Sequence, residues 1–112
     1  MSEKRRGIRY RTIAHARVHG LFNGDALLKD ISVTGCRIET TVFIEARPGT
    51  AYTLEVIPES AAKIASFELQ VETRWTNAAA DSYEVGFLVK ASPEGKQFQR
   101  YVDYLAWRSS NE

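Results

Sequence analysis

A stretch of regular alternation at residues 67–75 constrains the fold of this chain more than any other feature. One set of its side chains is Phe67, Leu69, Val71, Thr73 and Trp75, and the other is Glu68, Gln70, Glu72 and Arg74. A period of two is that of a β-strand with one buried and one solvated face. Because such a strand needs neighbouring strands and a core under its apolar face, the chain is expected to build a sheet.

Five other segments carry strand signals, with turn sequences between them. They cover residues 14–19, 26–31, 36–41, 52–57 and 83–89. Asn-Gly-Asp at 23–25 and Arg-Pro-Gly at 47–49 are typical of turns. In the segment 36–41, the alternation places Cys36, Ile38 and Thr40 on one face. Residues 60–66 can form either a helical turn or an irregular connection.

The period changes near the C-terminus. The apolar residues that recur there at helical spacing are Phe98, Tyr101, Val102 and Leu105. Ser92 followed by Pro93 is typical of a helix start. Six short strands followed by one helix indicate a mostly β protein, a small six-stranded antiparallel β-barrel with a C-terminal α-helix.

Length and composition fit one domain rather than two. The chain has 112 residues, of which 44% are hydrophobic, enough for a single core. No apolar run is long enough to cross a membrane, and Arg9 and Arg11 interrupt the stretch where a signal peptide would be apolar. The single cysteine, Cys36, cannot form an internal disulfide. We therefore expect a cytoplasmic protein without membrane insertion.

Charge is segregated along the chain. Residues 1–37 carry eight Lys/Arg and three Asp/Glu, a net charge of +5, whereas residues 38–112 carry seven and eleven, a net charge of −4. A basic segment of this kind either binds an anionic partner or is a solvated tail. We expect a flexible basic N-terminal segment over residues 1–12 and the barrel with its helix over residues 13–110.

Two short motifs stand out against this background. Arg5-x-x-x-Arg9 precedes the first strand, and Asp30-x-Ser32-x-x-Gly35 occupies the turn between the second and third strands. In this order they resemble the two motifs of the PilZ family, RxxxR and [D/N]xSxxG. Each motif alone is a weak signal, but the conjunction is much stronger. The resemblance implies a six-stranded barrel with a C-terminal helix and a bacterial receptor for cyclic di-GMP that signals to a partner protein.

The resemblance assigns the ligand contacts to particular side chains. An arginine can fork onto phosphate, pair with guanine O6 and N7, or stack on a purine, which suits Arg5 and Arg9. Possible additional contacts are Arg6, Arg11 and Arg37.

The second motif supplies the remaining contacts. The carboxylate of Asp30 can accept from the N1 and N2 donors of guanine. Ser32 can donate to the ligand while it fixes the turn, and Gly35 allows positive φ or a close backbone approach. Without the arginines, Asp30, Ser32 and Gly35 would be interpreted as an ordinary hairpin turn.

Other functions have weaker support. A PilZ-like adaptor that acts through protein contacts alone is the main alternative. A small barrel that binds single-stranded nucleic acid is disfavoured, because its aromatic residues, Trp75 among them, share strand faces with aliphatic core residues. We expect no DNA or RNA partner. His15 and His19 have no further metal ligand at suitable spacing, and no acid or base is placed beside Ser32. Cys36 alternates with core positions and is interpreted as a small buried hydrophobe rather than a nucleophile. Neither a metal, a cofactor nor catalysis is therefore expected.

Overall fold

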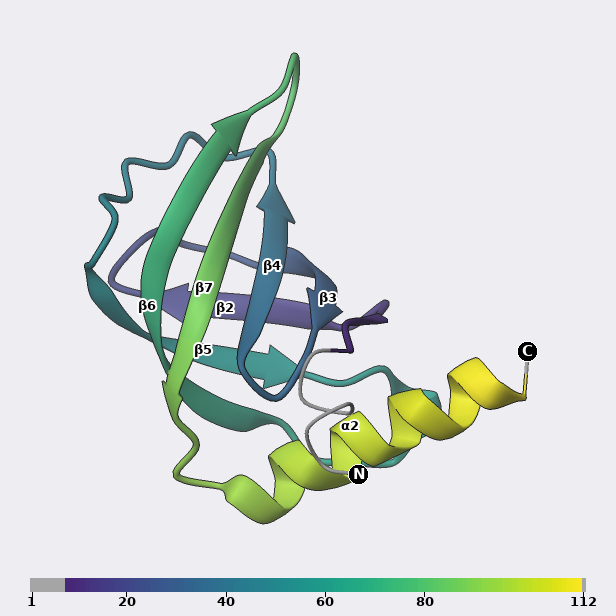
Figure 1. The fold of residues 1–112 in the computed structure, drawn as a ribbon. Coiled ribbons are helices and arrows are strands. Elements are labelled where there is room, and N and C mark those ends of the chain that lie inside the picture. The colour runs from purple at the N-terminus through teal and green to yellow at the C-terminus, as the bar shows by residue number, and fades with distance from the viewer. Residues whose placement is uncertain (1–7, 112) are drawn as a thin grey trace.

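Six antiparallel strands close into a barrel in the computed structural model, which describes residues 8–111 (Figure 1). The strands are β2 (His15–His19), β3 (Ala26–Ile31), β4 (Gly35–Thr40), β5 (Ala51–Ile57), β6 (Phe67–Ala78) and β7 (Tyr83–Ala91). Their order is β3-β2-β5-β6-β7-β4, and β4 pairs with β3 again, which closes the ring. Closure pairs the strand edges that an open sheet would expose. The expected six-stranded barrel is confirmed.

A short additional strand, β1 (Tyr10–Arg11), pairs with β3 beyond the end of β2. The hydroxyl of Thr12 donates to the carbonyl of Leu28 at 3.2 Å and accepts from the amide of Ala14 at 2.7 Å, which binds the connection between β1 and β2 to β3. Tyr10 and Arg11 were assigned to the basic N-terminal segment, and both are strand residues here. β1 therefore anchors the chain next to Arg9 on the barrel wall.

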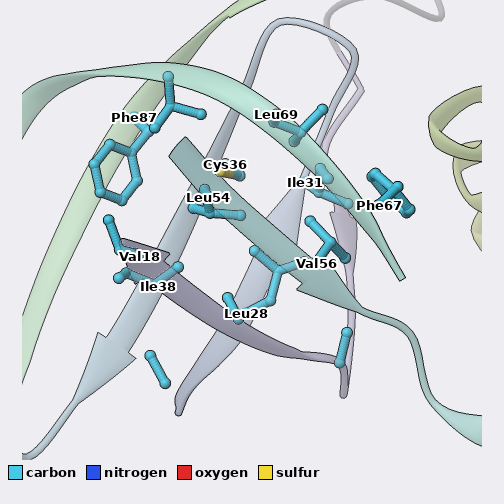
Figure 2. Close-up of a cluster of buried hydrophobic side chains, with 14 of the residues drawn as sticks. Val18, Leu28, Ile31, Cys36, Ile38, Leu54, Val56, Phe67, Leu69 and Phe87 are labelled. Atoms are coloured by element: carbon cyan, nitrogen blue, oxygen red, sulfur yellow. The ribbon is translucent and has the colours of Figure 1, made fainter. Parts of the chain in front are cut away.

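The core is built from the inward-facing residues of all six barrel strands, as Figure 2 shows. Cys36 and Ile38 are fully buried, and Thr40 on the same face of β4 is 6% exposed, which confirms the expected phase of this strand. Among the described residues, no helix is both long and apolar enough to cross a membrane. The segment after β5 contains a short 3₁₀ helix, Ser60–Ala62, followed by an irregular connection.

The helix α2 (Gly95–Ser110) lies across one end of the barrel (Figure 1). Its buried face consists of the four residues expected from the spacing: Phe98, Tyr101, Val102 and Leu105. The ring of Phe67, at the start of β6, packs against Phe98 and Tyr101 with centroids 5.8 and 6.0 Å away. The expected start at Ser92 and Pro93 is wrong, because Pro93 and Glu94 form a turn and the helix begins at Gly95.

Two buried acids make the stability of this fold sensitive to alkaline pH. Burial raises the pKa of the Cys36 thiol from 9.0 to about 12, and it raises the pKa of the Tyr101 hydroxyl above its usual 10.0. Above their ordinary pKa values the unfolded chain releases these protons while the folded protein keeps them, so stability falls as the pH rises. We expect the urea midpoint to fall from about pH 9 upward, and Cys36→Ala to reduce the first part of that fall. A midpoint constant to about pH 11 would contradict this expectation.

Candidate functional site

A β-bulge in β3 turns Asp30 onto the outer surface of the barrel. Leu28 points into the core, and strict alternation would direct Asp30 inward as well. Leu28 pairs with Ile38. Asp30 pairs with Arg37, the very next position on β4, so Lys29 is an extra residue in the ladder. A bulge of this kind shifts the alternation by one position. It therefore places the carboxylate of Asp30 on the outer surface, at a position that the sequence pattern assigns to the core.

The carboxylate of Asp30 lies between two arginines. Its Oδ1 accepts from Nη1 of Arg9 at 2.8 Å, and its Oδ2 lies 2.9 Å from Nη2 of Arg37. The side chain of Asp30 is 14% exposed, whereas those of Arg9 and Arg37 are 50% and 36% exposed. The structure thus brings together one residue of each motif, and Arg9 is the partner more accessible to solvent.

Ser32 and Gly35 shape the turn between β3 and β4. The hydroxyl oxygen of Ser32 accepts from the amides of Thr34 and Gly35, both at 3.2 Å, and the amide of Ser32 donates to the carbonyl of Gly35 at 2.8 Å. Ser32 is 2% exposed. A Cβ on Gly35 would lie 2.7 Å from the carbonyl oxygen of Phe87 and 3.2 Å from Nη2 of Arg9. Close approach of the neighbouring strand, rather than positive φ, therefore requires glycine here.

Trp75 lies on the outer surface and not in the core, so the expectation from the alternation is wrong at this residue. The register of β6 against β7 shifts between Thr73 and Trp75, which leaves Arg74 as an extra residue and turns the indole outward. Trp75 is 42% exposed, and its ring lies over Gly86, where an added Cβ would come within 2.2 Å of Cε2. Glycine at this position leaves the space in which the indole packs against the barrel wall.

The two bulges place one continuous row of residues across the outer surface. In register, Arg11 lies opposite Asp30, Asp30 opposite Arg37, Arg37 opposite Gly86, and Gly86 opposite Trp75. A cavity of about 250 Å³ adjoins this row, and it is lined by Arg9, Thr34, Arg74, Trp75, Gly86, Phe87 and Leu88. Two arginines and an aromatic face therefore line one hollow, and one of these arginines, Arg9, is bound to the carboxylate of Asp30.

Three predicted positions remain, namely Arg5, Arg6 and Arg11. Arg5 and Arg6 lie outside the described residues. Arg11 offers its carbonyl oxygen to the guanidinium of Arg108 on α2. A larger hollow of about 330 Å³, between His15, Val42 and Ser82, contains none of the motif residues, and we place the site at the smaller one.

The histidines behave as surface residues. His15 and His19 are 53% and 55% exposed and face Asp25 and Glu55 at 3.8 and 3.9 Å. Among residues 8–111, no group of three or more His, Cys, Asp or Glu is arranged to hold a metal ion.

The fold is similar to that of a solved protein. The structure of the Bacillus subtilis inhibitor of motility (MotI/DgrA) superposes with a TM-score of 0.75 at 16% sequence identity, over 94% of this chain and 50% of that one. This chain thus spans about half the length of that protein. No family model and no curated protein matches the sequence. The likeness is one of fold, a PilZ-like barrel with an extra strand and a C-terminal helix.

Proposed function

We propose that this chain, a PilZ-like barrel with both motifs of that family, is a bacterial cytoplasmic receptor for cyclic di-GMP and not an enzyme. The observation that carries the proposal is the contact between Arg9 and Asp30. These residues are 21 positions apart in the sequence, and their side chains meet at 2.8 Å beside a cavity bordered by an indole. Cation, carboxylate and aromatic face are the three groups that a phosphate-linked guanine ligand requires.

Binding would proceed by an exchange of partners at Asp30. The N1 and N2 donors of a guanine compete with Arg9 for Oδ1 of the carboxylate. Arg9 is half exposed, so breaking its ion pair with Asp30 costs no more than about 1 kcal/mol. Once released, its guanidinium is free to fork onto a ligand phosphate or onto guanine O6 and N7, contacts that are stronger because they are bidentate and charge-assisted.

Trp75 supplies a face on which a purine can stack. Its indole is exposed enough to receive a base and is held against Gly86. Stacking of a base on an aromatic side chain contributes about 1–3 kcal/mol. Arg74 and Arg9 line the same cavity and favour phosphates beside the stacked base.

Gly86→Ala tests the role of the indole. The new methyl group collides with the Trp75 ring, and because that ring is partly exposed it can swing away at a cost of about 1 kcal/mol or less. We expect cyclic di-GMP to bind roughly tenfold more weakly through the lost stacking. With Trp107→Phe as background, Trp75 is the one tryptophan, and its emission should respond to ligand before but not after the glycine is replaced. If the Trp75 emission of the Trp107→Phe protein does not change when ligand is added, the ligand binds away from the indole.

The route from this site to a partner protein runs through β1 and α2. Arg11 follows Arg9 by two residues, and its carbonyl accepts a hydrogen bond from Arg108 of the helix. When Arg9 moves onto a ligand, β1 moves with it and changes the surface shared with α2. Amide exchange of residues 8–14 and of α2 should slow with saturating cyclic di-GMP, and unchanged exchange in both would remove this route.

A PilZ-like adaptor without a nucleotide ligand is the second candidate, and one observation favours it. Three large apolar side chains, Ile13, Phe43 and Trp107, are more than 60% exposed, which suits protein contacts. Such an adaptor would keep its partner when Arg9 and Asp30 are both replaced by alanine. For a single-stranded nucleic-acid barrel, Phe67 and Phe87 offer no stacking surface, because they are 1% and 2% exposed, and Trp75 is the one exposed ring among the residues that line the cavity.

A competition assay tests the proposed function. Radiolabelled cyclic di-GMP is incubated with the purified protein, and unlabelled cyclic di-GMP, cyclic di-AMP and GTP are added separately. We expect displacement by cyclic di-GMP alone. The carboxylate of Asp30 selects the guanine edge, and the two arginines of the RxxxR motif, Arg5 and Arg9, select a ring with two phosphates. If the protein does not retain the radiolabelled cyclic di-GMP, or if all three nucleotides displace it equally, the proposal is overturned.

A further inference from the structure

Arg37 is held quite differently from Arg9. It lies on β4, between Asp30 on β3 and Gly86 on β7. Its Nη2 lies 2.9 Å from Oδ2 of Asp30, and its Nη1 lies 3.5 Å from Oε1 of Glu84. The guanidinium therefore bridges carboxylates on the two strands that flank its own, whereas Arg9 forms an ion pair with one carboxylate, that of Asp30, among residues 8–111.

These contacts argue against Arg37 as a direct ligand contact. To reach a phosphate, its guanidinium would leave two carboxylates, and Asp30 and Glu84, which are only 14% and 21% exposed, would lose a cation. Uncompensated charge at partly buried positions is costly. Arg9, whose side chain is half exposed, gives up one ion pair among the described residues. Of the two arginines, Arg9 is the one that can leave and Arg37 the one that stays.

We propose that Arg37 is a positioning residue that holds Oδ2 of Asp30, so that Oδ1 stays directed at the guanine edge after Arg9 has moved to the ligand. This inference rests on the proposed function. The two oxygens of Asp30 then have separate tasks: one is fixed to the barrel by Arg37, and the other is exchanged between Arg9 and the ligand. Glu84 fixes the opposite end of the guanidinium and limits its rotation.

Removal of Arg37 should change selectivity rather than overall attraction to phosphate. Without it, Arg9 is the remaining ion-pair partner of Asp30 in the part of the chain that the structure describes, so the carboxylate retains Arg9 and becomes a poor acceptor for guanine. A suitable probe for selectivity is cyclic di-IMP, which lacks the 2-amino group of guanine but has the same phosphates. A hydrogen bond to a charged acceptor corresponds to a preference of about tenfold or more for cyclic di-GMP in the wild type. We expect that preference to fall to about twofold or less in Arg37→Met.

Isothermal titration with both nucleotides provides the test, on wild type, Arg37→Met, Arg37→Lys, Glu84→Gln and Arg17→Met. Arg17 is the matched control, an outward-facing strand arginine whose Nε lies 2.6 Å from Oδ1 of Asp25, away from the motifs. The expected order of preference for the 2-amino group is wild type and Arg17→Met, then Arg37→Lys and Glu84→Gln, then Arg37→Met. If Arg37→Met does not fold, as judged by thermal melting, the lysine and glutamine variants carry the test.

The outcomes separate the two claims. A wild type that binds neither nucleotide overturns the proposed function and this inference with it. A wild type that binds selectively, with variants at Arg37 and Glu84 that weaken both nucleotides equally, makes Arg37 a phosphate contact and overturns this inference alone. Variants that only lower the melting temperature and keep the wild-type preference would show a purely structural ion pair, which also overturns it.

Discussion

Replacing Arg9 by alanine should weaken cyclic di-GMP binding by about 100-fold or more while it changes the free energy of unfolding by less than about 1 kcal/mol. The binding effect is large because a bidentate, charge-assisted contact to the ligand disappears. The effect on stability is small because the Arg9 side chain is half exposed, so water screens the arginine side of its ion pair with Asp30. Asp30 keeps Arg37 as a partner in this variant, so no carboxylate is left without a cation.

Titration calorimetry and urea unfolding on the same preparation check both halves of this expectation. Arg17→Ala is the control, since it removes an arginine from an outward-facing Arg–Asp pair far from the motifs and should leave ligand affinity unchanged. Equal losses of affinity in the two variants would mean that binding depends on general positive charge. A large loss of stability in Arg9→Ala would mean that Arg9 holds the barrel together rather than the ligand.

Arg108→Met should destabilise the folded protein by about 2–3 kcal/mol. The carboxylate of Glu59 is 9% exposed and lies 2.9 Å from Nη1 of Arg108, and it also accepts from the hydroxyl of Tyr101 at 2.7 Å. Removal of the arginine leaves a largely buried carboxylate without its cation, which is costly, and it also releases the carbonyl of Arg11 from the helix. The partial exposure of Arg108 keeps the cost below that of a fully buried pair.

Urea unfolding followed by circular dichroism measures this effect against Arg100→Met. Arg100 is an exposed arginine on the same helix whose Nη1 lies 3.1 Å from Oε1 of Gln97, and its replacement should change stability by no more than about 0.5 kcal/mol. If both variants unfold at the same urea concentration, the Glu59 network does not fix the helix to the barrel. The route from β1 to α2 would then lose its physical basis.

The barrel itself could be predicted from the sequence because alternation fixes which residues face the core. Cys36 and Ile38 on β4, and Leu69 and Val71 on β6, are buried as their phase indicates. The four apolar positions of α2 were also predicted from spacing alone. The start of this helix was not, since Ser92 and Pro93 carry a start signal that the chain uses for the preceding turn.

The candidate site was predicted only in part, and bulges explain the difference. The motifs identified Asp30, but alternation carried through β3 would have buried it beside Leu28, and alternation carried through β6 did misplace Trp75. An extra residue in one strand depends on how it pairs with a neighbour distant in sequence, which a single-strand pattern does not contain. One signal was present in the sequence: an aspartate at an inward position of a strand whose preceding inward residues, Ala26 and Leu28, are apolar.

The partners of Arg37 were beyond prediction for the same reason. Its pairing with Asp30 follows from the shifted register of β3 and β4, and its contact with Glu84 from the pairing of β4 with β7. The motif resemblance therefore treated Arg37 as one more possible ligand contact. The structure gives it two carboxylate partners, which is why its proposed role changes from binding to positioning.

Isothermal titration of the wild-type protein with cyclic di-GMP, beside cyclic di-AMP and GTP, addresses the central proposal most directly. We expect a saturable signal with cyclic di-GMP only, and no such signal in Arg9→Ala. A cooperatively folded protein that produces no heat with cyclic di-GMP would contradict the receptor and favour an adaptor that works through protein contacts alone.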